Sequence, residues 1–436
     1  MVIRLLPIVA LLSVHFVSPV SAQKSESELP KPYATKSAVH HPKVIGWPEG
    51  KMPKAPEGFK VAPFATDLDS PRWLYVLPNG DVLVAQARSL PKAKDDEEKK
   101  KDEKEKKMAE GMKKSKTVTG MSPNKITLLR DADGDGKPEV RETFLSELNQ
   151  PFGMALVKDT LFVANTNGVV KFAYQTGQTR IEGEGTKILD LPAGGYNNHW
   201  TRNLLPSRDG AKLFISVGSA SDHGENGSKY ELLRANILEC NLDGTGLRIF
   251  AEGLRNPVGM DWEPVTGKLW TAVNERDELG DDLVPDYITS VQEGGFYGWP
   301  YSYFGQHEDP RRKGQRPDLV KKAIVPDHAL GSHTASLGFT FYRGKSFPEK
   351  YQGGAFIGQR GSWNRSKFAG YRVAFVPFAQ GKPSGKEEDF LSGFLANETE
   401  AYGRPVGVAV AADGSLLVAD EPANVVWRVS RDAKDR

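Results

Sequence analysis

The chain has 436 residues, of which 26% are charged and 39% are hydrophobic, and its formal net charge at pH 7 is +2. A chain of this length can bury a large core, in one repeat domain or in two smaller domains. The near balance of charge gives no general attraction to nucleic acid. Cys240 is the only cysteine, which excludes a disulfide within the chain, and the lack of a CxxCH segment excludes covalently attached haem.

The first 22 residues have the pattern of a secretory signal peptide. Arg4 gives a positive start, residues 5–17 form a short apolar run, and small residues lead to Ala22. The apolar run is too short for a membrane span, and a buried N-terminal helix is the alternative. No later segment is apolar enough to cross a bilayer, so we expect an exported protein, periplasmic or extracellular, with no membrane span. The polar, proline-rich residues 23–57 predict a flexible leader.

From Gly58 onwards, apolar runs alternate with Asp-Gly, Asn-Gly or Thr-Gly turns, which is typical of many short antiparallel strands. One unit recurs along the chain: a polar corner, a strand, a tight turn and a second strand. A third strand often follows, and a fourth leads into the next corner. The six copies lie at residues 69–86, 149–165, 198–218, 254–274, 335–359 and 403–420.

Six units of about four strands predict an all-β, six-bladed β-propeller over residues 58–430, with a short tail at 431–436. The last strand, at 424–430, is the third of its unit, whereas the first run, at 58–66, precedes a corner as a fourth strand would. The N-terminal strand is therefore expected to complete the last blade and to remove two open sheet edges. A β-sandwich or another all-β array is the alternative.

Residues 91–117 interrupt the first unit with eleven lysines, eight acidic residues and almost nothing to bury. We interpret this insertion as a solvated excursion, briefly helical through pairs four residues apart. A partner-binding arm is the other interpretation.

In a propeller, the corners that lead into the innermost strands open on one face around the axis, together with the loops between second and third strands. This geometry would gather one histidine with several arginines and carboxylates. Such a set suits an anionic ligand, a divalent cation and an acid–base step. The corners contribute Gln150, His199, Arg255, Asn256, Ser336 and Arg404, and the loops contribute Glu275, Asp277, Asp281, Asp282, Gln359, Arg360 and Arg365.

Five motifs in this order resemble the glucose/sorbosone dehydrogenases, roughly over residues 58–430. The resemblance is closest to the L-sorbosone dehydrogenase branch. It implies an exported propeller that transfers hydride from a sugar, sugar aldehyde or related alcohol to pyrroloquinoline quinone (PQQ) bound through calcium. It also implies a separate external electron acceptor, a cytochrome or a quinone. The motifs are NNHW, LRNPVG, VNERDELGDD, GGFYGWPY and GRPVGVA.

The resemblance carries roles onto matching residues. His199 matches the general base, and Asp209 lies ten residues further on, as in the family pattern. Arg255 and Asn256 match the pair that contacts the cofactor, and Arg404 matches a partner of its carboxylates. Arginine suits this cofactor because its flat cation can lie on a quinone and can pair with carboxylates.

Other roles are carried less directly. Gly298 and Pro300 match backbone carbonyl donors to the calcium ion that polarises the quinone. Arg360 stands where the family often has a lysine, with Arg365 as a second candidate there. Gln150 is expected near the substrate. Ser336, from the corner of the fifth unit, completes the cofactor-binding residues that we expect.

The chain departs from the family at the aspartate that commonly orients the base. Gly218 is followed here by Ser219, and the next acid is Asp222, so either residue is a candidate substitute. The structural alternatives are a satisfied histidine at 199 and an Arg255–Asn256 pair that only pins its corner through backbone bonds. The acidic residues of the loop at 274–284 are interpreted as capping groups.

A second metal candidate lies outside these corners. Asp131, Asp133, Asp135 and Glu142 satisfy the D-x-D-x-D-G-x5-E calcium-loop pattern. The flanking segments are typical of strands rather than helices, and Pro138 stands where an apolar residue is usual. An Asp/Gly-rich hairpin without metal is therefore the alternative.

Two other functions fit the same scaffold, since propellers host many activities. One is a calcium-dependent lactonase or esterase, which would have no need of the arginine set for a neutral lactone. The other is a non-catalytic ligand-binding propeller, which Ser219 in place of the usual aspartate would favour.

Overall fold

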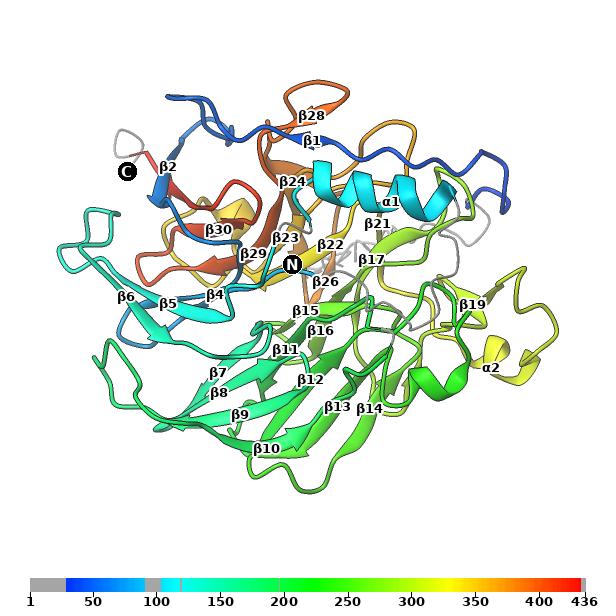
Figure 1. The fold of residues 1–436 in the computed structure, drawn as a ribbon, viewed down its shortest axis with the longest axis horizontal. Coiled ribbons are helices and arrows are strands. Elements are labelled where there is room, and N and C mark those ends of the chain that lie inside the picture. The colour runs from blue at the N-terminus through cyan, green and yellow to red at the C-terminus, as the bar shows by residue number, and fades with distance from the viewer. Residues whose placement is uncertain (1–28, 91–102, 118–119, 196, 433–436) are drawn as a thin grey trace, which may run out of the picture.

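The computed structural model describes residues 29–90, 103–117, 120–195 and 197–432. Among the described residues, five four-stranded sheets and one five-stranded sheet follow one another along the chain as the blades of a propeller (Figure 1). The predicted six-bladed propeller is therefore confirmed, and the alternative of a β-sandwich is wrong.

The blades are numbered in chain order, and their strands are given from the innermost outwards. Blade 1 holds β3 (Pro71–Val76), β4 (Val82–Gln86), β5 (Lys125–Arg130) and β6 (Val140–Leu145). Blade 2 holds β7 (Met154–Val157), β8 (Thr160–Asn165), β9 (Gly168–Ala173) and β10 (Thr186–Asp190). Blade 3 holds β11 (Arg202–Pro206), β12 (Lys212–Val217), β13 (Asn236–Asn241) and β14 (Arg248–Glu252), with β18 (Gly295–Phe296) as a parallel fifth strand.

Blade 4 holds β15 (Pro257–Trp262), β16 (Leu269–Val273), β17 (Pro285–Ser290) and β21 (His328–Ser332). Blade 5 holds β22 (Ser336–Phe341), β23 (Ala355–Gln359), β24 (Arg372–Val376) and β27 (Glu388–Leu391). Blade 6 holds β29 (Pro405–Val410), β30 (Leu416–Asp420), β31 (Val425–Arg431) and β2 (Phe59–Ala65).

Short elements complete the fold. Three two-stranded pairs join β1 (Lys43–Val44) to β28 (Glu400–Ala401), β19 (Ser302–Tyr303) to β20 (His307–Glu308), and β25 (Phe378–Ala379) to β26 (Lys382–Pro383). The helical elements are α1 (Glu103–Lys114), α2 (Pro317–Lys322) and the 3-10 turns η2 (Ser228–Glu231) and η3 (Glu349–Tyr351).

The N-terminal strand closes the ring. β2 pairs antiparallel with β31, from Phe59 opposite Arg431 to Ala65 opposite Val426. This strand completes blade 6, as the sequence predicted, and covers the edge that β31 would otherwise expose. Closure brings the first and last blades together without a disulfide, which a chain with one cysteine could not supply.

The repeated glycine of the corner motif has a packing reason. A Cβ on Gly407, in β29, would lie 2.7 Å from the carbonyl oxygen of Arg72, in β3 of the next blade. A Cβ on Gly259 would overlap Phe339, and one on Gly338 would overlap the carbonyl of Val406. The innermost strands of neighbouring blades therefore approach so closely that only hydrogen fits between them.

Apolar side chains fill the space between blades. Blades 5 and 6 share a cluster in which Phe356 and Val373 are fully buried and ring contacts join one aromatic side chain to the next. Burying each such side chain contributes about 1.5–3 kcal/mol relative to leaving it exposed. The core is therefore distributed around the ring, and it leaves the loops at the two faces free to carry polar groups. The aromatic members of this cluster are Tyr342, Phe347, Tyr351, Phe356, Tyr371, Phe375, Phe390, Phe394 and Trp427.

Antiparallel alternation sorts the loops onto two faces. The corners before the innermost strands and the loops between second and third strands open on one face, which we call the mouth. The first hairpin turn of each blade and the connection from the third strand to the fourth open on the opposite face.

The leader is bonded to the propeller along the part that the structure describes, from residue 29. The backbone N–H of Tyr33 donates to Leu279, that of His40 donates to Trp363, and β1 pairs with β28. The indole N–H of Trp47 donates to Asp420 at 2.7 Å. Instead of the flexible segment predicted for residues 23–57, residues 29–57 contact blades 4, 5 and 6. The predicted signal peptide at 1–22 lies outside the described residues.

The charged insertion contains the short helix that the sequence predicted. Its end is nevertheless packed rather than solvated, since Gly111 and Ser115 are buried. Gly111 lies against the imidazole of His41 from the leader, so closely that a Cβ at residue 111 would overlap the ring. Figure 1 shows α1 beside the leader. No helix among the described residues is long and apolar enough to cross a membrane.

Candidate active site on the mouth of the propeller

His199 lies in the corner before β11, and its ring contacts one residue of the neighbouring loop. The Nδ1 atom is 2.9 Å from both the carbonyl oxygen and the hydroxyl oxygen of Ser219. Because a carbonyl oxygen can only accept, Nδ1 carries the proton and Nε2 is the unprotonated nitrogen. Burial, and then the charge of Arg255, hold the pKa of His199 well below 6.5. The imidazole is therefore neutral and able to accept a proton at Nε2.

Arg255 and Asn256 form the next corner. The Arg255 side chain is buried, and its guanidinium donates to Asp222 Oδ1 at 2.7 Å and to the carbonyls of Asn274 and Glu275. Asn256 lies beside His199, because a Cβ on Gly218 between them would overlap Asn256 Oδ1 and His199 Cβ. The absence of a side chain at Gly218 lets the two corners meet.

Two buried oxygens in this region have no hydrogen-bond partner, namely Asn256 Oδ1 and Asp222 Oδ2. Burial alone would raise the pKa of Asp222, but the charges of Arg255 and Arg276 and a backbone N–H outweigh it and hold this pKa at about 2. Leaving a buried acceptor unpaired costs about 1–3 kcal/mol. These atoms are therefore places where a bound group or a cation would add a missing contact.

A cluster of three arginines around one carboxylate forms another side of the mouth. Glu421 has no exposed surface, and its two oxygens lie 2.7 Å from Arg72 Nη1 and 2.7 Å from Arg360 Nε. Burial alone would raise the pKa of Glu421, but Arg360 and Arg72 hold it at about 2. Arg404 donates to the carbonyls of Arg360 and Gly361, and burial together with the charge of Arg360 lowers its pKa to about 10. Positive charge exceeds negative charge here, which suits an anionic ligand.

The insertion reaches this cluster. The hydroxyl of Thr117, just beyond α1, accepts from Arg360 Nη2 at 3.1 Å and from Arg404 Nη1 at 3.4 Å. His41 stands close enough for the charges of both arginines to add to burial in lowering its pKa to about 4. The arginine pair is thus contacted from outside by the end of α1 and by the leader.

Contacts join the corners into one site. The guanidinium of Arg72 lies over the ring of Trp200, the neighbour of His199. On the other side, Asn364 donates to Asp277 at 2.5 Å, and Asp277 lies 3.8 Å from Arg255. Asn364 belongs to the same loop as Arg360. His199, Arg255, Asn256, Arg360 and Arg404 are therefore on one face of the propeller.

Residues 155–364 match the family model described as glucose/sorbosone dehydrogenase, and residues 311–432 match one described as TrAA12-like. Over residues 155–364 the chain is therefore similar to the glucose/sorbosone dehydrogenases. It is 32% identical over 206 residues to the aldose sugar dehydrogenase YliI of Escherichia coli, covering 42% of this chain and 52% of that protein. It is 25% identical over 301 residues to the PQQ-dependent pyranose dehydrogenase of Coprinopsis cinerea, covering 54% of this chain and 40% of that protein.

The matches cover between a quarter and about three fifths of the length of the first curated relatives. Among solved structures, it is similar to the holo form of the pyranose dehydrogenase PQQ domain from Coprinopsis cinerea. That match has a TM-score of 0.68 and 19% identity, and covers 89% of this chain and 99% of that one. The apo-form of the soluble aldose sugar dehydrogenase from Escherichia coli matches with a TM-score of 0.56 and 18% identity, covering 86% and 100%. At these identities the likeness shows a shared propeller fold.

The backbone carbonyl of Gly298, predicted as a calcium donor, is already hydrogen-bonded. This carbonyl accepts the backbone N–H groups of Tyr301 and Ser302, both at 2.9 Å, so both lone pairs serve the turn. A calcium ion at Gly298 would therefore have to displace or share these two hydrogen bonds. The adjacent Trp299 donates its indole N–H to the carbonyl of Asp222 at 2.9 Å, and Pro300 lies against Gly224. The Gly-Trp-Pro turn thus supports the Asp222 loop.

Two other predicted residues are hydrogen-bonded to the neighbouring blade. Ser336 is fully buried, its backbone N–H donates to Asp286 at 2.8 Å, and its hydroxyl contacts Thr334. The side-chain amide of Gln150 donates to the carbonyl of Arg88 at 2.7 Å. These contacts are those of residues that hold the corners in shape.

Predicted residues away from the mouth have separate surroundings. Asp209 lies in the turn after β11, where it accepts from the Ser207 hydroxyl and the Ala211 N–H, at the far end of the strand from His199. In the calcium-like loop between β5 and β6, the acid that joins Asp131, Asp133 and Asp135 within 4.8 Å is Glu139. The prediction of Glu142 in this group is wrong, because Glu142 lies within β6 and faces Arg180.

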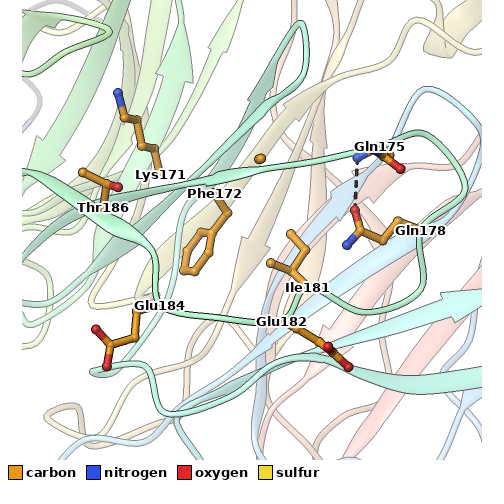
Figure 2. A pocket seen from close by; sticks show the side chains of 9 residues that line it. Lys171, Phe172, Gln175, Gln178, Ile181, Glu182, Glu184 and Thr186 are labelled. Atoms are coloured by element: carbon orange, nitrogen blue, oxygen red, sulfur yellow. Dashed lines mark hydrogen bonds between the residues drawn. The ribbon is translucent and has the colours of Figure 1, made fainter.

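The other acidic group with metal-ligand spacing among the described residues is Asp222, His223 and Glu278, next to Arg255. A shallow depression of about 410 Å³ lies instead on blade 2, between β9 and β10 (Figure 2). Its lining includes Lys171, Phe172 and Glu184 and none of the residues of the mouth.

Sequence reasoning did not place Arg72 and Glu421 among the site residues. Arg72 stands in a corner of the same kind as Arg255 and Arg404, which is a signal that could have found it. Glu421 follows β30, in a loop of the kind that also carries Arg360.

Proposed function

We propose that this chain is an exported PQQ-dependent dehydrogenase that oxidises a sugar, a sugar aldehyde or a related alcohol. One observation carries the proposal: a neutral, half-buried imidazole at His199 adjoins Trp200, whose ring lies under Arg72. Arg72 shares the carboxylate of Glu421 with Arg360, and Arg404 donates to the carbonyl of Arg360. The imidazole supports proton transfer, and the arginines support a flat anionic cofactor. The match of residues 155–364 to the glucose/sorbosone dehydrogenase model supports the same class of reaction.

The residues present fit this cofactor. The excess positive charge of Arg72, Arg360 and Arg404 would be offset by its carboxylates, and burial makes that offset worth more than it would be in water. Arg360 and Arg404 would hold the carboxylates, exchanging their shared contact with Thr117 for stronger charged partners. Arg255 and Asn256 would border the ring, where Asn256 Oδ1 has no partner of its own.

A calcium ion fits Asp222 better than Gly298. Calcium binds through oxygen atoms, and Asp222 Oδ2 is a buried carboxylate oxygen without a hydrogen-bond partner. Glu278 belongs to the same group, and the carbonyl of Pro300 remains a predicted donor nearby. When bound, PQQ would supply hydride acceptance and calcium would supply Lewis-acid polarisation.

The chain's own residues would manage the proton. The substrate hydroxyl would give its proton to His199 Nε2, because the Nδ1 proton is held by Ser219. The charge of Arg255 helps to keep the imidazole unprotonated before the reaction. The buried corners would exclude bulk water from this proton acceptor.

Finer features remain proposals. The external acceptor would be a separate cytochrome or quinone, because the chain has no haem-attachment motif and one buried cysteine. L-sorbosone is the substrate that we propose first, because the order and the residues of the corner motifs resemble the L-sorbosone dehydrogenase branch most closely. Export to the periplasm or the outside of the cell follows from the predicted signal peptide.

The test starts from purified protein without added cofactor. Calorimetry with PQQ and Ca²⁺ should show one site, and dye reduction with L-sorbosone and a panel of aldoses should depend on both additions. Failure to bind PQQ in the presence of Ca²⁺ would overturn the proposal. Hydrolysis of a lactone with Ca²⁺ alone would favour the calcium-dependent hydrolase instead, and PQQ binding without any turnover would favour the binding propeller.

A further inference from the structure

We infer that Ser219 is the positioning residue for His199, and that it acts through a hydrogen-bond chain that ends at Glu231. The inference rests on the proposed function, in which His199 takes the substrate proton. Both oxygens of Ser219 lie 2.9 Å from His199 Nδ1, and the residue has no exposed surface. A residue that places its backbone carbonyl and its side-chain hydroxyl on one ring nitrogen fixes both the ring plane and the tautomer.

The direction of each bond follows from counting protons. The hydroxyl of Ser219 donates its only proton to the carbonyl of Ser221 at 2.6 Å, so its lone pairs are left to face the Nδ1–H of His199. The hydroxyl of Ser221 donates to one oxygen of Glu231, and the N–H of Ala220 donates to the other at 2.8 Å. Ser221 is also fully buried. The chain of bonds therefore locks the hydroxyl of Ser219 as an acceptor toward the base.

The nearest acid is committed elsewhere. Asp222 Oδ1 accepts from Arg255 at 2.7 Å and from the N–H of Asp277 at 2.9 Å. Among the described residues, no hydrogen bond or ion pair joins Asp222 to the ring of His199. Of the two substitutes that the sequence left open, the geometry selects Ser219. The carboxylate of this arrangement, Glu231, does not contact His199 directly. It is linked to the base through Ser221 and Ser219.

This arrangement differs chemically from a carboxylate placed directly on the base. Neutral oxygens fix the tautomer without adding a negative charge next to the ring. The charged groups that face His199 are Arg255, Asp222 and Arg234, and burial with Arg255 outweighs Asp222. The base is therefore kept free of its second proton while its Nδ1–H remains anchored.

The first readout needs no cofactor. Selective ¹⁵N labelling of histidine, with His199→Gln to assign the signal, should show His199 of the wild-type protein as a single Nδ1–H tautomer. Ser219→Ala keeps the carbonyl but removes the hydroxyl, so the Nδ1–H signal should exchange with water at least about tenfold faster. Ser221→Ala, which does not touch the ring, should give a smaller change in the same direction. An unchanged Nδ1–H signal in Ser219→Ala would overturn the inference.

The second readout separates positioning from structure. With saturating PQQ and Ca²⁺, Ser219→Ala should lower kcat about fivefold to twentyfold, with the sugar KM and PQQ affinity unchanged, and Ser219→Thr should restore part of the loss. Ser415→Ala removes a buried hydroxyl in the turn after β29 and serves as the control, with no change expected. A loss of thermal stability or PQQ affinity with kcat preserved would mean that Ser219 is only structural. If PQQ failed to bind the wild-type protein, the proposed function would fail while the NMR result would still decide the role of Ser219.

Discussion

The guanidinium carbon of Arg72 lies 5.0 Å from the centre of the Trp200 ring. Arg72 shares Glu421 with Arg360, whereas Trp200 is the neighbour of His199 in the chain. A cation over an aromatic face contributes about 0.5–2 kcal/mol, depending on its desolvation. The contact therefore links the anion-holding side of the mouth to the proton-accepting side, and it sets the spacing between the parts that the proposed reaction needs.

Replacing the proton acceptor should separate chemistry from binding. His199→Ala should lower turnover by about 10²–10⁴-fold, because no other group would be placed to take the substrate proton. PQQ affinity, measured by calorimetry, should stay within a factor of a few. His328→Ala, at the start of β21 on the opposite face, is the matched control and should keep full activity. Persistent turnover in His199→Ala would show that the base is another group.

Removing one arginine should weaken cofactor binding. Arg404→Met keeps an apolar stem but removes the charge, so PQQ affinity should fall by about 10–100-fold, since a hydrogen bond to a charged group is worth about 1.5–3 kcal/mol. Arg343→Met is the control, because Arg343 is exposed and pairs with Asp261 away from the mouth. Equal PQQ affinity in the two variants would exclude Arg404 from the cofactor site.

The end of the insertion should compete with the cofactor. Thr117→Ala removes the hydroxyl that Arg360 and Arg404 share, which leaves Arg360 Nη2 and Arg404 Nη1 available to carboxylates. PQQ binding should become tighter, by up to about fivefold for the loss of one competing contact of about 1 kcal/mol. Weaker binding in this variant would show that the hydroxyl helps to hold the cofactor instead.

The ionisation of Glu275 should make the free energy of unfolding depend on pH. Burial raises its pKa to about 7, against the opposing effect of Arg255. A carboxyl group whose pKa is raised in the folded chain contributes stability below its ordinary pKa of 4.5, and this contribution is lost as pH rises through about 7. Glu275→Gln should therefore be more stable than the wild-type protein at pH 8 by up to about 3 kcal/mol, and the gain should vanish near pH 4.5.

Chemical denaturation of the cofactor-free protein at several pH values would measure this difference. Glu421 provides a contrast of opposite sign, because Arg360 and Arg72 overcome burial and hold its pKa at about 2. Its contribution is present above pH 4.5 and is lost as pH falls toward 2. Glu421→Gln should be destabilising at neutral pH by about 3–5 kcal/mol, since it leaves buried arginines without their anion. A pH-independent difference for Glu275→Gln would contradict the assignment.

The glycine contact between blades can be tested on the fold itself. Gly407→Ala would place a Cβ 2.7 Å from the carbonyl oxygen of Arg72, and overpacking of this kind costs about 1–3 kcal/mol. Gly194→Ala is the control, since nothing lies within 4 Å of the added carbon there. Thermal unfolding should show a lower Tm for Gly407→Ala alone, and equal Tm values would show that the blades adjust without cost.

The sequence by itself determined the ring and the corners. Its turns and apolar runs repeat with a spacing that only a set of similar blades explains, and the unmatched strand at each end predicted the pairing of β2 with β31. It also placed His199, Arg255 and Arg404 at equivalent corners. The alternation of strand direction decides on which face a corner lies, and this does not depend on the conformation of the loops.

The tertiary structure decided which polar groups are free to bind. The carbonyl of Gly298 is hydrogen-bonded within its own turn, and the N–H of Ser336 is bonded to Asp286 of blade 4. In contrast, Asp222 and Glu421 meet arginines from other loops at the mouth. The choice of Ser219 over Asp222 as the partner of His199 was settled in the same way. A hydrogen bond requires particular atoms within about 3 Å, and the folding of loops from distant parts of the chain sets those distances, which residue types and spacing leave open.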